Sequence, residues 1–227
     1  MQSNAWKLAP YALLVGIVPL VAVHLALGVS TTQGLIEACN PYLHGCTSIS
    51  RAGRYELANH LFQAFMLPYA TLLAGYWLLC TVWLRRLGGE SRVLVWIPVL
   101  GVVSAVFLIL YATFLGSEGD FYRLMRRYGV IVYFAFNFLA QLLMAARLHT
   151  LATQADLPFP RWVVQVKVVL CAGMLALGLA NVVGGAILVD NDAFENVIEW
   201  NAALLMTTYY FMTWWAWRKD GFSLRFG

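Results

Sequence analysis

The stretch Val93–Leu115, VLVWIPVLGVVSAVFLILYATFL, contains no charged side chain. A bilayer core about 30 Å thick is crossed by about 20 apolar residues in an α-helix. This stretch is long and apolar enough to cross it, and it lacks the sustained polar–apolar alternation of a strand in a membrane barrel. We therefore predict a membrane-spanning helix over residues 93–115.

Five further apolar runs of similar length lie on either side of this stretch. Only 11% of the residues are charged and the mean hydropathy is +0.71, whereas a soluble protein has roughly 25% charged residues. We predict an all-α, polytopic integral membrane protein in which residues 1–227 form a single six-helix domain. The predicted spans cover approximately residues 9–29, 61–84, 93–115, 128–146, 163–189 and 200–217.

Lysine and arginine are divided unequally between the two sides that six spans define. The side with both termini has ten of them and the other side has five. Because cytoplasmic loops carry the excess of positive charge, we predict that both termini are cytoplasmic and that the loop 30–60 covers the bundle on the outer face. The basic residues form no single patch, so no nucleic-acid partner is expected. The ten are Lys7, Arg85, Arg86, Arg92, Arg147, Arg161, Lys167, Arg218, Lys219 and Arg225, and the five are Arg51, Arg54, Arg123, Arg126 and Arg127.

The segment Cys39–His60, CNPYLHGCTSISRAGRYELANH, is the longest polar interruption of the chain. Cys39 and Cys46 are candidates for a disulfide if the outer side is oxidising, although their spacing alone leaves the pairing open. The same segment holds Ser48 and Ser50. These serines are read either as residues that cap and turn the loop or as part of a Ser–His hydrolase site, which would lack the usual nucleophile motif.

Histidines offer two cofactor alternatives that the sequence supports poorly. His24 and His60 could approach the arrangement of two axial haem ligands, but the pair is not distinctive. A zinc site would need His44, His60 and outer carboxylates, and no metal-binding spacing is present. We therefore expect no cofactor and no metal.

The second outer loop, Gly116–Tyr128, concentrates acidic and basic residues. Arg123 and Arg127 share one face if the segment is helical, and arginine suits the bidentate binding of phosphate. The loop is read either as a site for lipid phosphates or as a self-neutralising solvated surface. Glu199, at the start of the last span, needs a partner next to the membrane, and the arginines of the two outer loops are the expected ones.

Three sets of residues resemble the six-span FRAG/DRAM/Sfk-type membrane family. Cys39–Tyr42 and Thr47–Ser50 are similar to that family's cysteine followed by Pro-Ser-hydrophobic-Ser, with Thr47 in place of the proline. Gly116–Phe121 is similar to its Ser-Ser-Glu-Asp-Phe element, with one inserted glycine. The last span is similar at its Glu199-Trp200 start and at its Met-Thr-Trp-Trp end, residues 212–215.

The resemblance covers nearly the whole chain in order and is closest to the branch that remodels the lipid of GPI anchors. One departure is the segment 122–128, which lacks the histidine that the family commonly has before its fourth span. The resemblance implies a membrane phospholipid or glycolipid as partner and a location in a bacterial inner membrane or a eukaryotic endomembrane.

We therefore expect lipid remodelling or lipid head-group binding at the outer leaflet, with acyl transfer or hydrolysis if the protein is an enzyme. The alternatives are a non-enzymatic lipid organiser and a small transporter, the latter based on the mid-span residues Asn137, Gln141 and Asn181. The candidate catalytic residues are His60, Asp120 and Glu199. The candidate head-group residues are Ser48, Ser50, Arg51, Arg54, Glu118, Arg123, Arg126 and Arg127.

Overall fold

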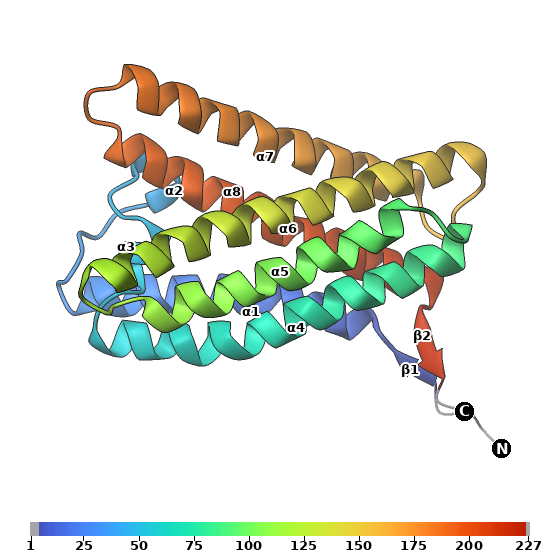
Figure 1. The fold of residues 1–227 in the computed structure, drawn as a ribbon, viewed down its shortest axis with the longest axis horizontal. Helices are drawn as coiled ribbons and strands as arrows, with labels where there is room; N and C mark the ends of the chain where they lie inside the picture. The colour runs from blue at the N-terminus through green and yellow to red at the C-terminus, as the bar shows by residue number, and fades with distance from the viewer. Residues whose placement is uncertain (1–4, 226–227) are drawn as a thin grey trace.

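A computed structural model describes residues 5–225, and the first four and last two residues lie outside the described part. Apart from one short two-stranded ribbon, the described part is helical, with six long and two short helices (Figure 1). In chain order the elements are β1 (Ala5–Lys7), α1 (Ala9–Thr32), α2 (Pro41–His44), α3 (Ile49–Ala52), α4 (Glu56–Gly88), α5 (Val93–Phe114), α6 (Asp120–Gln154), α7 (Arg161–Ile187), α8 (Asp192–Asp220) and β2 (Ser223–Arg225).

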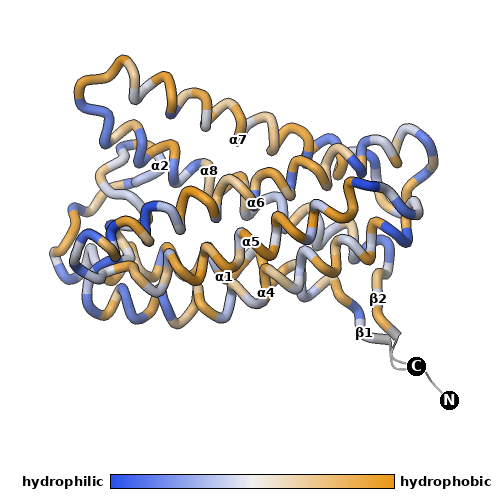
Figure 2. Tube along the Cα trace, in the orientation of Figure 1, coloured by the Kyte–Doolittle hydropathy of each residue, from blue (hydrophilic) through white to orange (hydrophobic). Residues whose placement is uncertain are grey.

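Five of the long helices, α1, α4, α5, α6 and α7, are long and apolar enough to cross a membrane. In Figure 2 the apolar residues occupy the middle of the bundle and the polar residues gather at its two ends. α4 and α6, with 33 and 35 residues, are longer than the predicted spans. Hydropathy marks only the apolar part of a helix, so the predicted spans omit polar turns that continue the same helix. α8 has 29 residues and a more polar sequence.

The long helices form a closed ring in the order α1, α4, α5, α6, α7 and α8, and α8 completes it by packing against both α7 and α1. Successive long helices run in opposite directions, so their connections lie at two ends (Figure 1). The terminal end holds β1, β2 and the α4–α5 and α6–α7 connections. The loop end holds α2, α3 and the α5–α6 and α7–α8 connections, and it corresponds to the predicted outer face.

Hydrogen bonds between side chains cross the interior of the ring. Trp77 Nε1 donates to Asn137 Oδ1 at 3.1 Å, and Asn137 Nδ2 donates to Tyr210 Oη at 2.6 Å. Lys167 Nζ donates to Thr213 Oγ1 at 2.6 Å. Lys167 was counted with the basic residues of the terminal side, but its side chain is 0% exposed and does not reach the surface. Buried polar groups in an apolar bundle are stabilised by such partners between helices.

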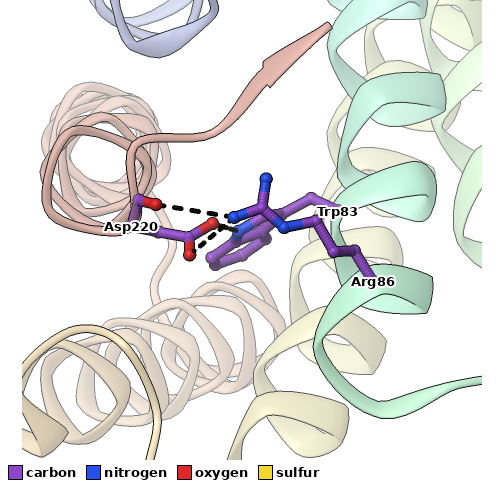
Figure 3. Close-up of polar contacts among 3 residues, drawn as sticks. All are labelled: Trp83, Arg86 and Asp220. Atoms are coloured by element: carbon purple, nitrogen blue, oxygen red, sulfur yellow. Dashed lines mark hydrogen bonds and ion pairs between the residues drawn. The ribbon is translucent and has the colours of Figure 1, made fainter.

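A cluster of three residues, the terminal latch, joins α4 to the end of α8 (Figure 3). Trp83 Nε1 donates to Asp220 Oδ2 at 2.9 Å, and Arg86 Nη2 donates to Asp220 Oδ1 at 3.1 Å. The Asp220 side chain is only 4% exposed. Beyond it, β2 pairs antiparallel with β1, and Leu8 N donates to Phe222 O at 3.0 Å. The ribbon therefore joins the two ends of the described chain, and the latch fixes the end of α8 to α4.

Candidate functional site

The loop 30–60, here called the first outer loop after its predicted side, lies on the start of α8. Its own carbonyl groups fix it there. Asn196 Nδ2 donates to Gly45 O at 2.8 Å, and Trp200 Nε1 donates to Thr47 O at 2.9 Å. Asn201 Nδ2 reaches Tyr42 O at 3.0 Å. These bonds use side chains of α8 to satisfy the backbone of an irregular segment, which would otherwise leave polar groups unpaired. The loop is thereby a fixed wall at the loop end of the bundle.

Short-range contacts set the shape of this loop. Cys39 and Cys46 form a disulfide with their Cα atoms 6.4 Å apart. Ser48 is the N-cap of α3, and its Oγ accepts a hydrogen bond from Arg51 N at 3.0 Å. That is the capping role expected of a serine before a helix. Ser30 Oγ of α1 donates to Ala52 O at 2.7 Å and fixes the other end of α3.

Ser50, Tyr111 and Glu199, here called the junction, bring the first outer loop, α5 and α8 together. Ser50 Oγ lies 2.9 Å from Tyr111 Oη, and either group can be the donor. The backbone amides of Ile49 and Ser50 lie beside the Glu199 carboxyl group. We expected Glu199 to pair with an arginine, but none of the ion pairs within residues 5–225 includes it. The first amides of α3 take that place, because the start of a helix has unpaired N–H groups.

A glycine on α6 allows α5 to bring Tyr111 into the junction. A Cβ at Gly129 would lie 2.8 Å from the backbone nitrogen of Tyr111. That distance is too short for two ordinary atoms, so the helices can approach this closely only where α6 has no side chain. Tyr111 is 2% exposed.

A hollow of about 400 Å³, the arginine hollow, opens beside the junction between the first and second outer loops. Asp120 and Arg123 form an ion pair at its edge, whereas no ion pair of the described residues includes Arg54 or Arg126. Burial lowers the pKa of the Arg126 guanidinium, and the neighbouring charges of Arg54 and Arg123 lower it further. Arg54 Nε is buried without a hydrogen-bond partner among the described residues. The lining residues are Arg54, Tyr55, Glu56, Gly116, Ser117, Glu118, Gly119, Asp120, Arg123 and Arg126.

A second hollow of about 430 Å³, the lateral cavity, lies between α6, α7 and α8. Its wall is apolar along α6, and Glu195, Glu199 and Ser50 lie where it reaches the loop end. The junction lies between the two hollows, because Ser50 and Glu199 line the lateral cavity while Tyr111 lies near Arg54, which lines the arginine hollow. Asn181, expected only as a mid-span polar group, also lines this cavity.

The predicted site residues thus separate into three groups. Arg54, Glu118, Asp120, Arg123 and Arg126 come together in the arginine hollow, and Ser50 and Glu199 meet at the junction. Ser48 is used as a helix cap. His60, Arg51 and Arg127 are exposed and line neither hollow.

Sequence reasoning did not select Tyr111 or Glu195 for the site. Tyr111 lies near the end of an apolar run, where a tyrosine is ordinarily read as an interface residue. Glu195 is one of several acidic residues that precede the last predicted span, and the sequence does not distinguish it from the others. A polar side chain near the end of an otherwise uniform apolar run is the one signal that could have found Tyr111.

The alternatives that involve histidine gain no geometric support. His24 Nδ1 lies 2.7 Å from Leu20 O and its Nε2 lies 3.2 Å from Tyr42 Oη, so both ring nitrogens have partners. In residues 5–225 no three histidine, cysteine, aspartate or glutamate side chains gather as a metal site would require.

Neither a protein-family model, nor a curated protein, nor a solved structure matches the chain. The geometry of the two hollows and the junction is therefore the basis for the function proposed below.

Proposed function

We propose that the protein is a six-span integral membrane protein with cytoplasmic termini, and that its loop end binds the head group of a membrane lipid at the outer leaflet. Support for the sixth span comes from α8, which is 29 residues long and closes the ring between two apolar helices. The distribution of ten and five basic residues supports the orientation.

The arginine hollow is the observation that carries the head-group proposal. Arg54 and Arg126 are close enough to affect each other, and neither is neutralised by an ion pair within the described chain. Two like charges held together are relieved by a bound anion, and guanidinium groups bind phosphate with charge-assisted hydrogen bonds. At the end of a membrane bundle, the phosphate groups of lipids are the anions at hand.

Replacement of the two central arginines tests this proposal. The Arg54→Gln/Arg126→Gln variant should bind phospholipid at least about a hundredfold more weakly than the unmodified protein, because it loses two charged hydrogen bonds of about 1.5–3 kcal/mol each. Retained lipid is measured by native mass spectrometry. Arg51→Gln is the matched control, because Arg51 belongs to the same loop but lines neither hollow. Equal retention by the double variant and the control would contradict head-group binding.

The junction favours a second candidate, lipid remodelling by the protein itself. In ester hydrolysis, a base accepts a proton from water as the water oxygen bonds to the acyl carbon, and it returns that proton to the alkoxy group, which leaves as an alcohol when its bond to the acyl carbon breaks. Glu199 is the carboxylate that could serve as this base beside Ser50 and Tyr111. In acyl transfer a hydroxyl of an acceptor lipid replaces the water.

Labelled phospholipid separates an enzyme from a lipid-organising protein with no turnover. An enzyme should release labelled fatty acid or form a new ester, Glu199→Gln should abolish this, and His60→Ala should not. Turnover that survives Glu199→Gln would remove Glu199 from the mechanism, and no turnover in any lipid would leave binding as the function. Transport receives least support, because Asn137 and Gln141 are hydrogen-bonded within the bundle.

A further inference from the structure

The lateral cavity has the dimensions and wall chemistry of a site for a lipid chain. Its α6 wall runs from Val130 to Phe138, and a helical rise of 1.5 Å per residue makes this about 12 Å. Small residues on all three helices make room for it, and a Cβ added at Gly178 on α7 would meet no atom within 4 Å. Ile131, which lines the cavity, is 52% exposed, so the opening faces the surface of the helix bundle where lipid lies.

Acidic groups lie where the cavity reaches the loop end. Glu199 faces the amides of Ile49 and Ser50, and Glu195 Oε1 accepts a hydrogen bond from Asn191 Nδ2 at 2.6 Å. A carboxylate has about four acceptor positions, so both groups can accept further N–H donors. None of the ion pairs in residues 5–225 involves either glutamate. The cavity therefore joins an apolar slot to two carboxylates that no cation of the described chain neutralises.

A positive group lies on the other side of the junction. Arg54 lies near the Tyr111 hydroxyl, which is hydrogen-bonded to Ser50 where the lateral cavity reaches the loop end. A head group that extends from the lateral cavity past Ser50 would therefore meet the two carboxylates first and the Arg54 guanidinium beyond them. This order of charges complements a molecule with an ammonium and a phosphate next to each other.

From this charge order and the apolar slot, we infer that the loop end binds a phospholipid with a primary-amine head group, of which phosphatidylethanolamine is the simplest. One acyl chain lies in the lateral cavity, the ammonium meets Glu195 and Glu199, and the phosphate meets Arg54. A choline head group has no N–H to donate, and a purely anionic head group is repelled by the two carboxylates. This inference rests on the proposed head-group binding and names the lipid class that it selects.

Competition among lipids with identical chains tests the choice of head group. We expect the protein in lipid nanodiscs to retain phosphatidylethanolamine about tenfold over phosphatidylglycerol and phosphatidylcholine, in line with one charged hydrogen-bonded pair. Glu195→Gln and Glu199→Gln should each reduce this preference. Glu195 is exposed, so its variant remains informative if Glu199→Gln fails to fold. No preference in the unmodified protein, or a preference unchanged in both variants, would overturn the inference.

Filling the slot tests the position of the acyl chain. Gly178→Leu should reduce retention of every phospholipid several-fold, because the new side chain occupies the cavity. Gly28→Leu is the matched control, since Gly28 is also a helical glycine with no atom within 4 Å of an added Cβ and lies on α1 away from the cavity. Equal retention by the two variants would place the chain elsewhere. If the Arg54→Gln/Arg126→Gln variant loses lipid while the glutamate and Gly178 variants do not, head-group binding stands and the present inference fails.

Discussion

The two ends of the helix ring contain similar polar residues and arrange them differently. At the terminal end, Asp220 is enclosed by Trp83 and Arg86, which both donate hydrogen bonds to its carboxylate. At the loop end, Arg54 and Arg126 line a hollow without an ion pair in the described chain, and Glu199 faces backbone amides. Charges that satisfy one another hold helices together, whereas charges left beside open space are available for a ligand.

Under the proposed function, stability depends mainly on the terminal end and lipid binding on the loop end. Natural proteins often lose stability where a site needs uncompensated groups. Substitutions at the terminal end should therefore mainly lower the free energy of unfolding, and substitutions of similar size at the loop end should mainly lower lipid binding.

The largest effect on stability is expected at the terminal latch. Asp220→Ala removes the acceptor of both Trp83 and Arg86, and should lower the free energy of unfolding by about 2 kcal/mol, because a buried donor is left unpaired. Thermal unfolding in detergent measures it. Asp156→Ala is the control, since that carboxylate forms an ion pair with Arg161 in which the side chains are 97% and 65% exposed. Such an exposed pair contributes at most about 1 kcal/mol, and equal losses in the two variants would contradict the special role of the latch.

An intermediate effect is expected when the first outer loop is released. Replacing Cys39 and Cys46 together with serine removes a short cross-link, and the loop-closure entropy of such a link is about 2 kcal/mol. The variant should keep part of the order of this loop, because Asn196 and Trp200 still donate hydrogen bonds to its carbonyl groups. Hydrogen exchange should rise within residues 39–53 while the middle of the bundle stays protected. A uniform rise over all helices would show that the loop stabilises the whole ring.

The smallest effect is expected in the arginine hollow. Arg126→Gln removes a guanidinium whose pKa is lowered by burial and by Arg54, so its loss costs little. The free energy of unfolding without lipid should change by less than about 0.5 kcal/mol. The same variant should bind less lipid. A loss of stability as large as that of Asp220→Ala would make Arg126 a structural residue and would remove the contrast between the ends.

Much of the fold could be predicted from apolar runs, because a chain in lipid must form helices wherever it is uniformly apolar. Because successive spans cross in opposite directions, the first and second outer loops are predicted to lie at the same end. The structure confirms this, since Arg54 and Arg126 lie close together there. Apolar runs could not predict which face of each helix points into the ring. In a helix such as α5, almost every residue is apolar, so hydropathy does not distinguish the face that carries Tyr111 from the face toward lipid.

The lateral cavity could not be predicted from the sequence either. It depends on small residues such as Ala135, Gly178 and Ala202 meeting at one level of three helices, and such a meeting is decided by helix rotation and packing rather than by composition. His60 stays a prediction for which no contact offers support, because nearness to the serines in sequence does not turn its side chain toward them.

The closure of the ring by α8 has a consequence for how the protein is made. α1 packs between α4 and α8, so it gains its second neighbour only after four further long helices have been synthesised. α8 is also the long helix that does not meet the hydropathy of a membrane span by itself, and its Trp200 and Tyr210 find their hydrogen-bond partners on the loop and on α6. As the proposed sixth span, α8 should therefore depend for its insertion on a binding surface prepared by the earlier helices, and its insertion would be the step that closes the ring.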